Sequence, residues 1–216
     1  MTVDNSVQKY YKKIQIQIDT EDREFLNTFN PINEKHRPQK DLQPCPFEGN
    51  LKNAKVILLL ANPGFTPTDK PNASDVSDHD RDGFDDWGLW GLSSKTKSSM
   101  HGWWRKRLKS FVRNIDSEEE WRQLSLKVAS VQAVPWASEQ FHEINGLPSK
   151  EIIANLVKEL SDEKYFVIMR QRSYWSEILM NRSEEKIMFT KNPRCSYLSE
   201  GNMDSADFKK LKSLLT

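Results

Sequence analysis

The sequence predicts an α/β protein with three layers, α/β/α, built around a mostly parallel four-stranded central sheet. Helical patterns alternate with short apolar segments, which is the order that a parallel sheet requires. The first apolar segment, residues 55–61, is apolar on both faces, as is typical of a strand in the buried middle of such a sheet. The remaining segments have similar length and composition and comprise residues 128–134, 165–169 and 186–190.

The first forty residues predict helix ahead of the sheet. Pro31 and Pro38 interrupt this region. Its apolar residues recur at helical spacing in two sets, Val7, Tyr10, Tyr11, Ile14 and Ile18, then Phe25, Leu26 and Phe29. We therefore expect a helical extension over residues 1–40 that docks against an α/β domain over residues 41–216.

Residues 66–100 show no periodicity and are rich in Asp, Ser, Gly and Pro. A segment of this length without regular structure is uncommon inside a compact domain, and it is usually either functional or disordered. Its charge changes sign abruptly: seven Asp lie between positions 69 and 86, whereas seven Lys or Arg and no acids lie between 95 and 113. We expect a long loop inserted over the site, followed by a basic surface.

The remaining helices are expected between and after the strands. One carries Trp104, Leu108 and Phe111 at helical spacing, and the next opens with a capping box from Ser117 to Glu120. The later helices are marked by these residues: Ile152, Ile153, Leu156, Val157 and Leu160; Trp175, Ile178 and Leu179; and Phe208, Leu211, Leu214 and Leu215 after a cap at Asp204.

Composition excludes several classes of protein. The 216 residues include 32 Lys or Arg and 31 Asp or Glu, so the net charge of +1 argues against a globally basic nucleic-acid coat but leaves room for a local basic face. Two cysteines cannot make a four-cysteine metal site. The sequence shows no signal peptide and no apolar run that could span a membrane, so we expect a cytoplasmic protein, associated with the nucleoid if bacterial.

Familiar cofactor and metal motifs are missing from the chain. It lacks the glycine-rich motifs of nucleotide triphosphate and dinucleotide sites and the nucleophile elbow of esterases. Residues 78–83 match the first half of a calcium loop, but position twelve would be Leu89 in place of the bidentate Glu. The four histidines have no metal spacing, and only His101 could reach the site. We expect no cofactor and no metal.

A site is expected where the strands end. Each apolar segment is followed by a polar or irregular one, and parallel strands bring such segments to one edge of the sheet. These segments are Asn62 to Gly64, Gln132 to Trp136, Arg170 to Ser173, and Asn192 to Ser199.

Two of these segments resemble motifs of the uracil-DNA glycosylase-like superfamily. LLLANPGF, residues 58–65, resembles the first motif of its mismatch-specific uracil/thymine-DNA glycosylase branch, and TKNPRCSYLSEGN, residues 190–202, resembles the second motif of the superfamily. Between them, SMHGWWRKRL resembles the start of the helix after the pocket loop, and VASVQAVPWAS resembles the strand that carries the base-reading amide. The order and spacing match over about residues 44–203.

The resemblance implies a role for each matching residue. Asn62 would position the attacking water, Asn192 would bond the base or its departing anion, and Gln132 would read the edge of the flipped base, with Pro63 and Gly64 lining the pocket. An aromatic residue would stack on the base, the candidates being Phe65, Phe84, Trp87 and Trp90. Arg194, Ser196, Tyr197 and Leu198 would fill or pin the gap in the duplex, and Lys95, Lys97 and Arg105 would contact phosphates.

The leading hypothesis is thus a monofunctional DNA glycosylase that hydrolyses the N-glycosidic bond of a flipped damaged, mismatched or modified base. The partner would be DNA, for example a duplex that contains a lesion or a modified base, and we expect the protein to be a monomer. One alternative is a non-catalytic nucleic-acid or nucleobase-binding module with the same fold, and another is a nucleoside or nucleotide hydrolase. Asn62-Pro63-Gly64 is also compatible with a simple strand-ending turn, Gln132 with a core amide, and the basic run with a solvated helix face.

Overall fold

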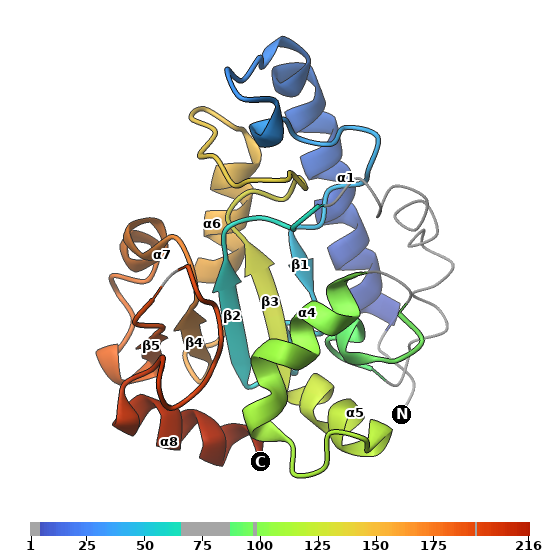
Figure 1. The fold of residues 1–216 in the computed structure, drawn as a ribbon. Coiled ribbons are helices and arrows are strands. Elements are labelled where there is room, and N and C mark those ends of the chain that lie inside the picture. The colour runs from blue at the N-terminus through green and yellow to red at the C-terminus, as the bar shows by residue number, and fades with distance from the viewer. Residues whose placement is uncertain (1–4, 66–86, 97–98, 193) are drawn as a thin grey trace.

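The structure is a computed structural model that describes residues 5–65, 87–96, 99–192 and 194–216. Its sheet has five strands in the order β1-β3-β2-β4-β5 (Figure 1). Four of them run parallel to one another, as the sequence predicts: β2 (Val56–Leu60), β3 (Val128–Gln132), β4 (Tyr165–Ile168) and β5 (Ile187–Phe189). β1 (Phe47–Glu48) pairs antiparallel with β3, so the sheet is mixed and has five strands where four were expected.

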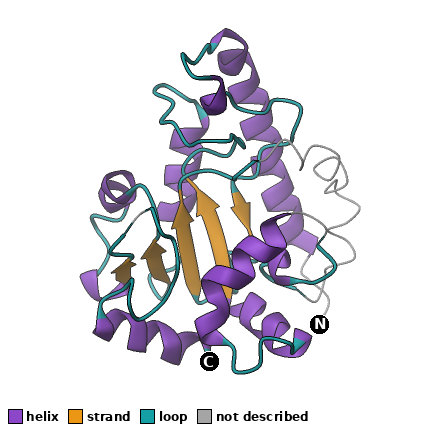
Figure 2. Cartoon of the chain, viewed as in Figure 1, coloured by secondary structure: helices purple, strands orange, loops and turns teal. Residues whose placement is uncertain are grey.

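Helices cover both faces of the sheet (Figure 2). On one face, α4 (Ser99–Leu108), α5 (Glu118–Lys127) and α8 (Ser205–Leu215) enclose a core that includes Leu58, Trp104 and Leu211. On the other, α1 (Asn5–Thr28), α6 (Ser149–Lys158) and α7 (Arg172–Ile178) enclose a core that includes Ile57 and Trp175. Successive β2 side chains enter opposite cores, so every residue of β2 is buried.

Local sequence signals account for the helix ends. Ser117 caps α5 by accepting a hydrogen bond from the Glu120 backbone N–H, and Asp204 caps α8 by accepting from that of Ala206. Short 3₁₀ turns complete the connections: η1 (Glu34–His36), η3 (Trp90–Leu92), η4 (Lys109–Phe111) and η5 (Glu184–Lys186).

The N-terminal region is one continuous helix that packs into the α6 layer. Ile14 and Ile18 of α1 are buried in the same core as Ile153. The buried carboxylate of Asp22 accepts hydrogen bonds from Trp136 Nε1 (2.7 Å) and from the Ser149 backbone N–H (2.8 Å). Burial raises the pKa of Asp22, and these two donors oppose the shift. The contacts tie α1 to the start of α6 and to the segment after β3.

The long-loop prediction for residues 66–100 needs correction at its carboxyl end. Residues 87–96 form η3 and the chain around it, and Leu89 and Leu92 are fully buried in the α4 core. These leucines insert because the chain crosses the end of α5, where the Leu89 backbone N–H donates to the Ser125 carbonyl. Residues 66–86 lie outside the described part of the chain. Within the described part, no helix is both long and apolar enough to cross a membrane.

Candidate functional site

The carboxyl ends of the four parallel strands lie at one edge of the sheet (Figure 1). The chain leaves the central strand β2 for β3 on one side and later returns to β4 on the other. In open α/β sheets, ligands bind outside the carboxyl ends of the strands at such a reversal of strand order. Asn62 lies two residues after the end of β2 and therefore at this point.

Two hydrogen bonds orient the Asn62 side chain. Its amide Nδ2 donates to Ser138 Oγ at 2.8 Å and to the Pro63 carbonyl at 3.0 Å. Ser138 Oγ donates its own hydrogen bond to the Gln140 carbonyl at 2.8 Å, so it can only accept one from Asn62. Both partners thus require the NH₂ group on this side. The carbonyl Oδ1 of Asn62 has no donor among the described residues and is left to accept a hydrogen bond from a ligand or a water.

The segments after β2 and β3 run side by side beyond the sheet. The Val134 backbone N–H donates to the Ala61 carbonyl at 2.8 Å, and Gly64 forms an isolated parallel bridge with Ser138. This pairing holds Asn62 and Ser138 in place. Gly64 is exposed, and a Cβ added there would meet nothing within 4 Å, so the backbone at this position is open to a ligand. Pro63 is half-buried beside it.

Gln132 ends β3 opposite Leu60 of β2 and is 93% buried, its relative exposure being 7%. Its backbone N–H donates to the Pro46 carbonyl, but its buried side-chain oxygen Oε1 accepts no hydrogen bond among the described residues. Ser130, two residues earlier and on the same face, has a buried hydroxyl in the same condition. Buried polar atoms are rarely left unpaired, and each costs about 1–3 kcal/mol. Gln132, which lies at the end of the strand, is therefore the one of these two residues whose oxygen could accept a hydrogen bond from a bound molecule.

His101 lies in the first turn of α4, against the backbone of Gly91 and Ser93. Burial, followed by the positive charge of Arg105, lowers the pKa of His101, which keeps the imidazole neutral at neutral pH. Its Nδ1 is buried without a partner among the described residues. After Ser130 and Gln132, His101 is thus a third side chain with a buried polar atom that has no partner among the described residues.

Asn192 lies after β5 and is exposed. Its Oδ1 accepts a hydrogen bond from the Arg194 backbone N–H at 2.9 Å, and its own backbone N–H donates to Asn202 Oδ1 at 3.0 Å. The amide Nδ2 has no acceptor among the described residues. Asn62 therefore presents a free acceptor and Asn192 a free donor, on strand ends about 10 Å apart at ordinary strand spacing.

The aromatic candidates differ in their accessibility. Phe65 and Trp90 are buried, with relative exposures of 7% and 9%, and Trp87 is half-buried against the α4 core. Phe84 lies outside the described residues. Trp87 is therefore the most accessible of the three described candidates.

The loop expected to enter DNA is only partly available. Ser196 and Leu198 are fully buried, and Leu198 packs in the α4 core, so neither side chain is exposed for the predicted contact with DNA. The cause is the Leu198 backbone N–H, which donates to the Arg107 carbonyl at the end of α4 and draws the loop onto the helix. Arg194 is exposed and Tyr197 half-buried, so these two residues are the accessible ones.

Asn202 organises this loop, a role that sequence reasoning missed. It is 8% exposed, and its Nδ2 donates to the carbonyls of Cys195 and Tyr197, while its own carbonyl accepts from the Lys191 backbone N–H. The loop geometry around Asn192 therefore depends on a buried amide ten residues further on.

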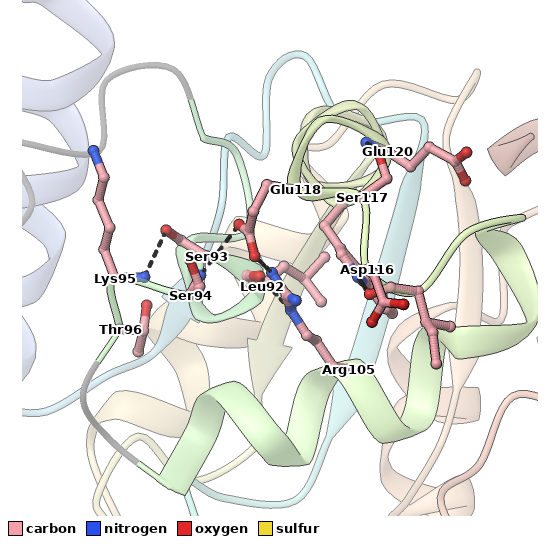
Figure 3. A network of polar contacts seen from close by, with 12 residues as sticks. Leu92, Ser93, Ser94, Lys95, Thr96, Arg105, Asp116, Ser117, Glu118 and Glu120 are labelled. Carbon is pink, nitrogen blue, oxygen red and sulfur yellow. Dashed lines mark hydrogen bonds and ion pairs between the residues drawn. The ribbon is translucent and has the colours of Figure 1, made fainter.

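Arg105 was predicted to contact phosphate, but its side chain makes contacts within the protein instead. Its guanidinium pairs with Glu118 and donates to the Leu92 carbonyl at 2.9 Å (Figure 3). It also stacks over Trp121, 4.9 Å from the ring centre. With its charge compensated by Glu118, Arg105 joins α4 to η3 and α5. Lys95 is exposed, as a phosphate contact requires, and Lys97 lies outside the described residues.

Glu48 of β1 joins η3 and α4 to the sheet. This carboxylate is 4% exposed and accepts hydrogen bonds from the Gly91 backbone N–H at 2.7 Å and from Trp104 Nε1 at 3.0 Å. Gly91 allows this approach, because a Cβ there would lie 2.4 Å from Trp104 Cδ1 and 2.8 Å from Glu48 Oε1. The sequence offered no signal for Glu48, since a strand of two residues has no periodicity.

Comparison of the chain with models of protein families, with curated proteins and with solved structures finds no match. Within the described ranges, no three His, Cys, Asp or Glu side chains gather in a way that could hold a metal ion.

Proposed function

We propose that this protein is a DNA glycosylase-like hydrolase that cleaves the N-glycosidic bond of a flipped damaged, mismatched or modified base. The observation that carries the proposal is the fixed orientation of Asn62. Its NH₂ group donates to Ser138 and Pro63, and its Oδ1 has no donor among the described residues, at the reversal of strand order where α/β sheets bind ligands.

Cleavage of an N-glycosidic bond passes through an oxocarbenium-like state, as in sugar hydrolysis. It needs a placed water and stabilisation of the charge on the departing base. Asn62 Oδ1 would position the water by accepting a hydrogen bond from it, and Asn192 Nδ2 would stabilise the base by donating to it as it becomes anionic. As the bond from C1′ of the sugar to the base breaks, the water oxygen bonds to C1′, and the departing base anion takes up the proton that the water loses. The buried amide of Gln132 suits recognition of the base edge, since an occupant would satisfy its unpaired Oε1.

A second candidate function is a non-catalytic nucleic-acid or nucleobase-binding module, and one observation favours it. The segments that follow the strands, residues 61–65, 132–138, 169–171 and 190–192, contain no Asp or Glu. An amide cannot accept the proton of the attacking water as a carboxylate does. Turnover would therefore depend on a base that is already a good leaving group, and without one the site would only bind.

The test is a glycosylase assay on labelled oligonucleotides. The panel holds uracil, G·U and G·T mismatches, hypoxanthine and bulky modified cytosines, each treated with alkali after incubation. We expect strand cleavage on at least one substrate and a loss of about 100-fold in rate for Asn62→Ala. Asn181→Ala, an exposed amide in the turn after α7, is the matched control and should cleave at the wild-type rate.

Two outcomes would contradict the enzyme. DNA binding that survives Asn62→Ala, with no cleavage of any substrate, would support the binding module. Turnover of free nucleosides without cleavage of DNA would support a nucleoside hydrolase.

A further inference from the structure

Arg107, in the last turn of α4, is held rigidly between two aromatic rings. Its guanidinium lies 4.2 Å from the ring centre of Trp103 and 5.0 Å from that of Tyr197. One of its terminal nitrogens donates to the Trp103 carbonyl at 3.3 Å. The Arg107 carbonyl accepts from the Leu198 backbone N–H, so the loop after β5 is fastened to the same residue. A cation fixed in this way loses little conformational entropy on binding a ligand.

A second guanidinium contacts the same loop after β5. Arg170 follows β4, and one of its terminal nitrogens donates to the Arg194 carbonyl at 3.5 Å, three residues before the Tyr197 ring that Arg107 contacts. Burial lowers the pKa of Arg107, the phenol of Tyr197 opposes this shift, and the positive charge of Arg170 adds to it. Arg194, itself exposed, belongs to the same group of residues. The cluster joins the ends of α4 and β4 to the loop after β5.

This cluster has no counter-charge among the described residues. Within the described ranges neither Arg107 nor Arg170 forms an ion pair, and the other ionisable groups that act on Arg107 are a phenol and a thiol, those of Tyr197 and Cys195. The Nε atoms of both arginines are buried and have no acceptor in the part of the chain that the structure describes. Arg105 on the same helix shows the contrast, because its charge is paired with Glu118.

Two half-buried cations with unpaired donors raise the free energy of the protein unless an anion joins them. A phosphate group fits this arrangement, because its oxygens accept several N–H groups and match the planar fork of a guanidinium. Arg170 follows β4 at the carboxyl edge of the sheet, and β4 is the neighbour of β2, the strand that precedes Asn62.

We propose that Arg107 and Arg170 together bind one phosphodiester group of a nucleic acid whose base occupies the neighbouring site. This assignment rests on the proposed function. Arg107 provides the preorganised contact, Arg170 completes it from the adjoining strand end, and the exposed Arg194 faces the same backbone. The predicted phosphate contacts Arg105 and Lys95 are not needed for it.

The experiment measures affinity for an oligonucleotide duplex by fluorescence anisotropy between about 50 and 200 mM KCl. Each neutralised phosphate contributes about 0.9 to the slope of log K against log salt. Arg107→Gln and Arg170→Gln should each reduce the slope by about 1. The double variant should lose no more than either single one, because both side chains bind the same phosphate. Lys106→Gln, an exposed cation on the same helix, is the matched control and should leave the slope near the wild-type value.

Folding is controlled by Arg107→Lys, which retains the charge, and by thermal unfolding of every variant. A slope equal to that of Lys106→Gln in both arginine variants would overturn the shared site, and a double variant that loses about 2 would show two separate phosphates instead. Neither result touches the cleavage assay, so the proposed function would stand or fall separately. Stabilisation of the wild type by inorganic phosphate or a mononucleotide, without duplex binding, would overturn the assignment to a phosphodiester.

Discussion

Asn62 Nδ2 and Ser138 Oγ are joined by a 2.8 Å hydrogen bond across 76 positions of sequence. Ser138 is buried, and its own proton goes to the Gln140 carbonyl, so the bond sets which face of the Asn62 amide is free. The bond also connects the ends of β2 and β3, the two strands beside the reversal of chain order. Ser138 is thus a positioning residue for Asn62.

Removal of this support should slow turnover without weakening binding. In Ser138→Ala, Asn62 keeps only the Pro63 carbonyl as partner, so its Oδ1 is less well aimed at the water. We expect kcat to fall by about 10- to 100-fold at unchanged KM, measured on the best oligonucleotide substrate. Ser213→Ala, an exposed hydroxyl on α8, should have no effect. An unchanged kcat in Ser138→Ala would mean that the hydrogen bond serves the fold alone.

Gln132 should contribute to recognition of the base while lowering the stability of the protein or leaving it unchanged. Because its buried Oε1 has no partner among the described residues, Gln132→Leu removes an unsatisfied polar atom, and the free energy of unfolding should stay equal or rise by about 1 kcal/mol. Affinity for the modified base should fall in the same variant. Urea unfolding and binding assays measure the two effects, with the exposed Gln123→Leu on α5 as control. A loss of more than about 2 kcal/mol would identify Gln132 as a structural amide.

Glu48 should matter for stability more than any exposed carboxylate. Glu48→Ala leaves the Gly91 N–H and Trp104 Nε1 without this acceptor, and each buried orphan donor costs about 1–3 kcal/mol. We expect a loss of about 3 kcal/mol in urea unfolding, with a smaller loss for Glu48→Gln, whose amide oxygen still accepts one bond. Glu163→Ala is exposed and should unfold like the wild type. Equal stability of Glu48→Ala and Glu163→Ala would refute the anchoring role.

The raised pKa of Tyr174 predicts that the protein loses stability at alkaline pH. Burial, and then the charges of Glu143 and Glu177, raise the pKa of Tyr174 from 10.0 to about 12. Because the folded pKa is the higher one, this contribution to stability is complete below pH 10 and disappears as the pH rises towards 12. Chemical unfolding at several pH values should show a smaller alkaline loss in Tyr174→Phe than in the wild type. Tyr165→Phe retains Tyr174 and should keep the full loss.

Much of the architecture was predictable from local pattern. The four apolar runs became β2 to β5 because strands that are buried on both faces need continuous apolar sequence, and the caps at Ser117 and Asp204 lie where the side chains of Ser and Asp satisfy helix N–H groups. β1 was not predictable, since two residues carry no period and their pairing depends on the exposed edge of β3.

The site was predictable in its positions but not in its contacts. Parallel strands bring their carboxyl ends together, so Asn62, Gln132 and Asn192 could be assigned to one edge from sequence. Their partners, Ser138 for Asn62 and Asn202 for Asn192, could not, because a hydroxyl or an amide has no local pattern that reports a distant partner.

The amino-acid sequence alone determined the strands, most helices and the edge at which polar groups gather, because apolar period and capping act over a few residues. Packing decided which side chains remain available at that edge. Leu198 looked like a wedge for DNA and is buried, Arg105 looked like a phosphate contact and is paired with Glu118, and Arg107 has no carboxylate partner among the described residues. Each of these outcomes depends on which distant segment lies opposite, and that is set only when the layers pack.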